Sequence, residues 1–244
     1  MSLKPKKSPA EEVGKQHYQL RQVKPLTDNQ TKTFEAYDAG KNLVLSGSAG
    51  SGKSFLALYL ALKDVLAFGS YYKKIIIIRS AVPSRDLGFV PGTLEEKSKI
   101  YQEPYMNIVN ELVGRGDAWH FLFNKQIIEF QTTSFLRGLT FNDCIIIFDE
   151  FQSATFHEID SVLTRVGENC RFVLCGDHAQ NDLNIKKEKS GFIDAVNILS
   201  NISETERIQF TIDDVVRSGF VKDYLREKER LGLAWYLIIV LRRT

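Results

Sequence analysis

The residues best suited to chemistry lie in one glycine-rich stretch, Gly47-Ser48-Ala49-Gly50-Ser51-Gly52-Lys53-Ser54. One apolar run precedes this stretch and a longer one follows it, which predicts a strand, a loop and a helix in that order. Glycines let successive backbone amides point at phosphate oxygens, and the following helix presents its positive end to the same anion. Lys53 would reach the β- and γ-phosphates, and the Ser54 hydroxyl would bind Mg²⁺. We therefore predict a P-loop that binds a nucleoside triphosphate.

A pair of acids, Asp149 and Glu150, follows the apolar run 144–148. P-loop NTPases place such an apolar strand, ending in Asp-Glu, opposite the lysine. Asp149 is predicted to hold Mg²⁺ through its water shell, and Glu150 to orient or deprotonate the attacking water. Two acids at a strand end can also be simple N-caps of the next helix. The P-loop about a hundred residues earlier favours the catalytic interpretation.

A third polar segment follows the apolar run 171–175. A polar side chain just past such a strand can lie beside the γ-phosphate and respond to its loss, and we predict this role for Gln180, with Asp177 nearby. The alternative, a polar turn after a core strand, stays open on spacing alone. His178 is expected to be an exposed loop residue, because phosphoryl transfer depends on positioning and charge more than on imidazole.

Upstream of the P-loop, Thr27 and Gln30 have the spacing of a capping box at the start of a helix. A side-chain amide at this place could also contact adenine, because glutamine offers both a donor and an acceptor. The two roles are compatible, and both stay open.

Bulk properties favour one soluble globular domain. The chain has 244 residues, of which 43% are hydrophobic and 25% charged, enough for one α/β core and short for two. The net charge of +2 restricts any nucleic-acid surface to a local patch. There is no C-x-x-C spacing, and Cys144 and Cys175 are predicted to be small core residues rather than zinc ligands or disulfide partners. A reducing cytosol fits this pattern, and no signal peptide is recognised.

The chain divides into three predicted regions. Residues 1–20 are predicted to be a flexible basic N-terminal arm, 21–228 the P-loop domain, and 229–244 an apolar C-terminal tail. The tail is too short to span a bilayer, which takes about 20 apolar residues. Packing on the domain or on a neighbouring subunit is favoured over a membrane-surface anchor.

These segments together resemble the PhoH family of P-loop ATPases, which are relatives of the superfamily 1 helicase core found in bacteria and many of their phages. The resemblance covers roughly residues 25–228. Besides the two phosphate-site motifs, it rests on the stretches 87–97, 136–141, 163–167, 176–183 and 213–217. The stretch 87–97 is the specific one, because generic P-loop proteins lack it. Phe151 stands where the family usually has alanine, and His178-Ala179 replaces the usual Pro-Thr or Pro-Ser; neither change removes a charged group.

The resemblance implies an α/β, three-layer P-loop NTPase (RecA-like) domain with a mainly parallel central sheet. It also implies ATP and Mg²⁺ as cofactors, ATP hydrolysis and association with RNA. Some members form ring-shaped homo-oligomers with unwinding activity. The expected location is the bacterial cytosol or a phage-infected host, without membrane attachment.

Hydrolysis calls for a positive charge on the γ-phosphate in the transition state. A helicase core has two facing domains and this chain has room for one, so an arginine must come from a short local segment or from another subunit. Arg217 is preferred, because it follows the last predicted strand and is expected at the start of the closing helix. Arg165 is the second candidate. For either residue, a salt bridge or a helix-end charge is an open alternative.

For nucleic acid, the expected contacts lie in the loops after two strands, at Arg79, Ser80, Thr132 and Thr133. No aromatic stacking platform is evident, so sequence-specific reading is not expected. A second hypothesis is a nucleotide-dependent switch or scaffold that unwinds nothing. A third, a small-molecule kinase, would need an arginine-rich lid that the sequence does not offer.

Overall fold

The computed structural model describes residues 20–80, 94–136, 140–177 and 190–231, and the structural statements below refer to these ranges. The fold is built on a six-stranded sheet of order β3-β2-β4-β5-β1-β6, in which every neighbouring pair of strands is parallel. The strands are β1 (Asn42–Gly47), β2 (Lys74–Arg79), β3 (Ile128–Thr132), β4 (Cys144–Asp149), β5 (Arg171–Gly176) and β6 (Thr205–Phe210). This architecture confirms the predicted α/β fold with a parallel central sheet.

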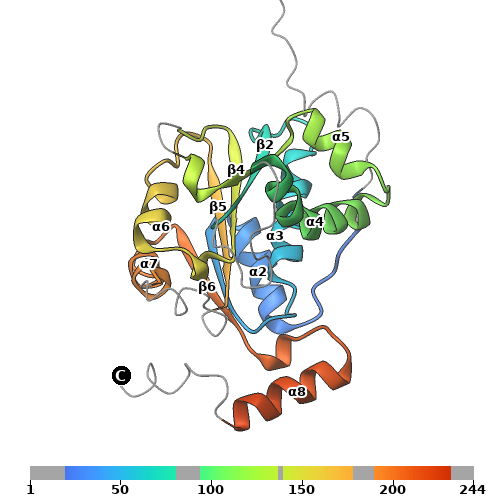
Figure 1. The fold of residues 1–244 in the computed structure, drawn as a ribbon, viewed down its shortest axis with the longest axis vertical. Coiled ribbons are helices and arrows are strands. Elements are labelled where there is room, and N and C mark those ends of the chain that lie inside the picture. The colour runs from blue at the N-terminus through green and yellow to red at the C-terminus, as the bar shows by residue number, and fades with distance from the viewer. Residues whose placement is uncertain (1–19, 81–93, 137–139, 178–189, 232–244) are drawn as a thin grey trace, which may run out of the picture.

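Helices cover both faces of the sheet and make three layers (Figure 1). One face packs against α2 (Asp28–Asp38), α3 (Lys53–Val65), α4 (Leu94–Val113) and α5 (Ala118–Asn124). The other face packs against α6 (Phe156–Leu163) and α7 (Phe192–Leu199). The strands are apolar on both sides because both faces are covered. In β2, for example, Ile75 and Ile77 face the first layer and Ile76 and Ile78 the second.

The connection between β4 and α6 contains Phe151, one of the residues at which the chain departs from the family that it resembles. Phe151 begins a short 3-10 helix, η3 (Phe151–Ser153), and its ring stacks on that of Phe192 at the start of α7, with centroids 4.6 Å apart. A Cβ added at Gly176 would lie 2.8 Å from the Phe151 ring, so the end of β5 has room only for glycine. The large side chain therefore fills the space between η3, β5 and α7 and leaves the charged residues beside it in place.

The last helix stands apart from the body of the molecule (Figure 1). After β6 the chain forms a second 3-10 turn, η5 (Ile212–Asp214), and α8 (Gly219–Arg230) starts only after Ser218. Arg217, expected at the start of the closing helix, therefore lies two residues before the helix begins. No residue of α8 is buried, and Arg226 holds the helix to η5 through an ion pair with Asp213.

The predicted terminal regions fall mostly outside the described residues. The N-terminal arm 1–20 contributes only Leu20, and α8 continues to Arg230, so the predicted domain end at residue 228 lies inside a helix. The apolar segment 232–244 lies outside the described part. Among the helices that are described, none is long and apolar enough to cross a membrane.

Candidate functional site

The predicted P-loop connects the carboxyl end of β1 to α3 and has the backbone that a phosphate cradle needs. Gly47 and Gly52 have φ values of 119° and 84°, which side chains other than glycine rarely adopt. A Cβ at Gly47 would also lie 1.9 Å from the carbonyl oxygen of Phe210, so this position excludes every larger residue. Lys53 begins α3, and its Nζ donates to the carbonyl oxygens of Gly47 and Ser48 at 2.8 Å each. The ammonium group is therefore held inside the loop.

The two predicted metal ligands meet although they lie far apart in the sequence. The Ser54 hydroxyl donates to Oδ1 of Asp149 at 2.9 Å, joining the start of α3 to the end of β4. Asp149 is 6% exposed, and burial together with the neighbouring Glu150 raises the pKa of its carboxyl group, against the opposing hydrogen bonds from Ser54 and Tyr105. A buried carboxylate beside a second acid and a hydroxyl is an all-oxygen donor set. These residues therefore fit a hard cation such as Mg²⁺.

The described residues contain no cluster of three or more His, Cys, Asp or Glu side chains placed to hold a metal ion. Proteins usually bind Mg²⁺ with one or two carboxylates together with substrate phosphates, and the ion keeps several waters. Ser54 and Asp149 are the residues that would hold the ion here.

Tyr105 is a site residue that the sequence did not reveal. It projects from α4, is 1% exposed, and its hydroxyl donates to Oδ2 of Asp149 at 3.0 Å. Burial, and then the Asp149 charge, raise the pKa of the phenol well above its usual value, so it remains a donor. Both oxygens of Asp149 are thus fixed, one by Ser54 and one by Tyr105. In the sequence this tyrosine looks like any core residue of an amphipathic helix.

We expect Tyr105→Phe to weaken Mg²⁺ binding by about 10–100-fold, because a group that orients a metal ligand is worth about that much. The measurement is the Mg²⁺ concentration that gives half-maximal nucleotide binding or turnover. Tyr59→Phe is the matched control, because Tyr59 is a buried tyrosine on α3 that packs beside Phe34. An unchanged Mg²⁺ requirement in Tyr105→Phe would contradict the orienting role.

Glu150 is held in an unusual conformation next to Asp149. Its backbone is left-handed, with φ 53° and ψ 36°, and its Oε2 accepts a hydrogen bond from Nε2 of Gln152. Gln152 is fully buried, and its Oε1 accepts from the backbone N–H of Asp177 at 3.0 Å. Gln152 therefore connects the predicted water-activating carboxylate to the end of β5. No role for Gln152 was predicted from the sequence.

The predicted γ-phosphate contact Gln180 lies outside the described residues, as does His178. The residues that flank the segment 178–189 are described, and both of them contact Gln152. Asp177 donates through its backbone N–H to the side chain of Gln152, and Ser190 donates through its hydroxyl to the backbone oxygen of Gln152 at 2.7 Å. Asp177 and Ser190 are thus both held at Gln152, two residues after Glu150.

Gln30 braces the P-loop against α2. Its Nε2 donates to Ser51 O at 3.2 Å, and its Oε1 accepts from the backbone N–H of Leu26 at 2.9 Å. The hydroxyl of Thr27 caps α2 as predicted, by accepting from the Gln30 backbone N–H. The return bond of a capping box would go to the N–H of Thr27 and goes instead to Leu26. Gln30 is therefore adjacent to the nucleotide loop, and adenine contact stays a prediction.

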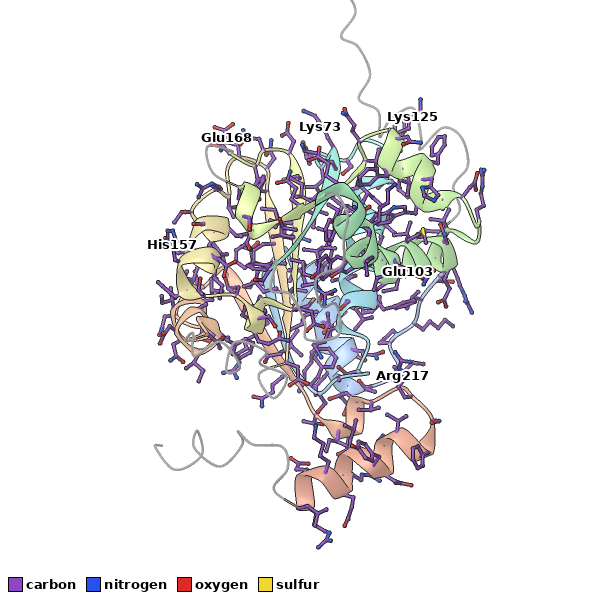
Figure 2. The ribbon with its side chains drawn as sticks, in the orientation of Figure 1. Lys73, Glu103, Lys125, His157, Glu168 and Arg217 are labelled. Atoms are coloured by element: carbon purple, nitrogen blue, oxygen red, sulfur yellow. The ribbon has the colours of Figure 1, made fainter. Side chains whose placement is uncertain are left out.

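The two candidate arginines lie at opposite ends of the strands, Arg217 at the carboxyl ends and Arg165 at the amino ends. Arg217 lies against the P-loop of its own chain: a Cβ at Gly50 would be 3.1 Å from Arg217 Cγ, and the backbone N–H of Val216 donates to Gly50 O at 3.1 Å. Figure 2 shows Arg217 where α8 joins the body, and Glu168 at the far end of the molecule.

Arg165 lies at the amino end of the strands, away from the P-loop. Its carbonyl oxygen accepts from Phe141, which precedes the amino end of β4. Its guanidinium donates to the backbone oxygens of Leu136 and Ser161 at 2.7 and 2.6 Å. Arg165 therefore joins α6 to the segment before β4, and within one chain it is not brought to the P-loop.

The four residues predicted to contact nucleic acid divide between the two faces of the sheet. Arg79 and Thr132 are register neighbours, and Arg79 is also the register neighbour of Asp149. The Arg79 guanidinium lies over the Tyr101 ring of α4, 5.3 Å from its centroid. Ser80 and Thr133 instead donate to Oε1 of Glu158 on α6. Only Arg79 and Thr132 thus lie on the face of the sheet that packs against α3 and α4.

Three features define a P-loop NTPase here. The lysine lies inside the P-loop, the aspartate at the end of β4 is bonded to the P-loop serine, and β5 lies between β4 and β1 in a parallel sheet. The PhoH-like protein family matches residues 22–227, and the chain belongs to this family.

Several curated relatives share this domain. A PhoH-like protein of Mycobacterium bovis is 33% identical over 202 residues, which is 82% of this chain and 56% of the relative. A PhoH-like protein of Bacillus subtilis is 35% identical over 176 residues, 72% of this chain and 54% of the relative. Protein PhoH of Escherichia coli is 28% identical over 189 residues, 76% of this chain and 52% of the relative. The chain thus spans about half the length of these relatives.

Among solved structures, the Pif1 helicase from Candida albicans is similar with a TM-score of 0.40 and 17% identity, over 84% of this chain and 44% of the helicase.

Proposed function

We propose that this chain binds Mg²⁺ and ATP and hydrolyses the phosphoanhydride bond between the β- and γ-phosphates. The observation that carries the proposal is the hydrogen bond between Ser54 and Asp149, because it brings the P-loop and the acidic strand end to one point. The P-loop amides and Lys53 would bind the phosphates, and Ser54 and Asp149 would hold Mg²⁺. When bound, the ion would neutralise charge on the β- and γ-phosphates. Gln30 would contact the adenine ring beside the loop.

In the proposed reaction Glu150 orients the attacking water and accepts its proton. Gln152 donates to Oε2 of Glu150, and the other carboxylate oxygen, Oε1, would accept from the water. Gln180 would lie at the γ-phosphate; this is supported by Asp177 and Ser190, the described residues on either side of 178–189, which both bond to Gln152. Arg217 supplies the positive charge, supported by its position over Gly50. Arg165 could act only at the P-loop of another subunit.

We further propose that single-stranded RNA binds along the carboxyl edge of the sheet and stimulates hydrolysis, and that the chain acts as a homo-oligomer in the cytoplasm, without a membrane. Arg79 supports the RNA contact, because it lies at this edge beside Asp149, with Tyr101 under its guanidinium. The oligomer is an expectation from the family resemblance, since some members form rings. The regions proposed above, an arm at 1–20, a domain at 21–228 and a tail at 229–244, remain our proposal.

The test measures ATP turnover with Mg²⁺ in three conditions: alone, with single-stranded RNA and with single-stranded DNA of the same length. We expect basal hydrolysis and a clear increase with RNA. Hydrolysis that responds to neither nucleic acid would favour the second candidate, a nucleotide-dependent switch or scaffold. Tight ATP binding with no turnover in any condition would contradict the hydrolase proposal itself.

A further inference from the structure

Two cysteines outside the nucleotide site lie in contact at the amino ends of β4 and β5. The Sγ atoms of Cys144, the first residue of β4, and Cys170, just before β5, are 3.3 Å apart. The two residues are separated by a connection that includes α6, so their spacing in the sequence gave no sign of the pair. Both are free thiols, and Cys175, the third cysteine, is buried near the other end of β5.

The backbone is suited to a bond between them. Ile145 and Arg171 are register partners in the parallel ladder, so the residues that precede them lie side by side on adjacent strands. Neighbouring strands are about 4.8 Å apart, and disulfides join Cα atoms about 4.4–6.8 Å apart. Both side chains point into the same apolar layer under α6. A disulfide therefore needs only that the two sulfurs close the gap between them, without a shift of the sheet.

The two thiols differ in access and acidity. Cys144 is fully buried, whereas Cys170 is half-buried and reachable from solvent. The hydrogen bond between the two sulfurs lowers the pKa of Cys170 and raises that of Cys144. The Cys170 thiol donates to the carbonyl oxygen of Phe141 at 3.0 Å, which holds the side chain in place beside β4. Cys170 is thus placed to react first and Cys144 to follow.

We propose that Cys144 and Cys170 are an oxidation site that closes to an intramolecular disulfide on exchange with a small disulfide of the glutathione class. The Cys170 thiolate attacks the disulfide, forms an S–S bond to one half and releases the other half as a thiolate. Cys144 then loses its proton, its sulfur attacks Cys170 Sγ, and the second half leaves as a thiol. The small disulfide is reduced to two thiols, and the two cysteines are oxidised.

The bond would join the amino ends of the two strands whose carboxyl ends carry Asp149 and Asp177. Because the cross-link closes the loop that contains α6, it restricts the unfolded chain and stabilises the folded one. Thermal unfolding is therefore expected at a higher temperature for the oxidised chain, and a reductant should reverse the shift. The Cys170→Ser chain should show no such shift.

The direct test incubates the full chain with oxidised glutathione, unfolds it in the presence of an alkylating reagent and records the intact mass and the peptide map. We expect one alkylated cysteine, Cys175, and a linked pair of peptides that contain Cys144 and Cys170. Cys144→Ser should stop at a glutathione adduct on Cys170, and Cys170→Ser should not react. Cys175→Ala is the matched control and should still form the bond.

Three alkylated cysteines in the natural chain would overturn the proposal. So would a lasting glutathione adduct on Cys170 despite the presence of Cys144, or a disulfide that links two chains. These outcomes do not depend on the nucleotide chemistry, so the oxidation site and the proposed hydrolase can fail separately.

Discussion

Arg217→Ala is expected to lower ATP turnover by about 10³-fold, while ATP affinity changes much less, because an arginine on the γ-phosphate acts mainly in the transition state. Arg226→Ala is the matched control: Arg226 is an exposed arginine on α8 whose ion pair with Asp213 is a surface contact. Single-turnover rates and nucleotide titrations of both variants separate the effect on rate from the effect on binding. Equal rates for the two variants would remove Arg217 from the reaction.

Because Arg217 lies over Gly50 of its own chain, we expect it to act within that chain, and mixing two inactive variants tests this. When the Arg217→Ala chain is mixed with a Lys53→Met chain, no activity should return, because neither chain holds both a working loop and the arginine. If the arginine acted on a neighbouring subunit, the Lys53→Met chain would supply it to the intact loop of the other. Recovery of turnover in the mixture would therefore contradict action within one chain.

Glu150→Gln is expected to reduce turnover by about 10²–10⁴-fold, the usual contribution of a general base, and to leave Mg²⁺–ATP binding intact. The amide keeps the size of the side chain and loses the ability to accept the proton from water. Glu168→Gln makes the same chemical change at the far end of the molecule, where Glu168 is exposed (Figure 2). Rapid turnover by Glu150→Gln would assign water activation to another group.

The parts of the site that could be predicted are those that depend on a few residue types at fixed spacing within a short stretch of sequence. The P-loop requires glycine at a fixed spacing before lysine and serine, and the acidic pair must end an apolar strand. Each motif forms the local structure that was predicted for it, because that structure depends on the backbone geometry of neighbouring residues only. Their meeting at Ser54 and Asp149 follows from the parallel sheet, which brings all the carboxyl ends of its strands to one edge.

The contacts that were missed depend on packing between distant elements. Tyr105 reaches Asp149 only because α4 packs against the sheet, and a tyrosine in a helix has the same pattern whether its hydroxyl is used or not. Arg165 follows a helix in the sequence much as a catalytic arginine could, yet the path of α6 carries it to the opposite edge. Spacing along the chain does not determine which edge a connecting segment reaches.

The stretch from Phe210 to Arg217 grips the phosphate loop on two sides. Phe210 O accepts from the Ser48 backbone N–H at 3.3 Å, and Val216 donates to Gly50 O at 3.1 Å. Two residues further on, α8 extends from this stretch into solvent with Phe220 and Tyr224 exposed. A displacement of the P-loop would therefore act on the start of α8 through these two hydrogen bonds, and no residue of α8 is buried against the body of the domain to resist it.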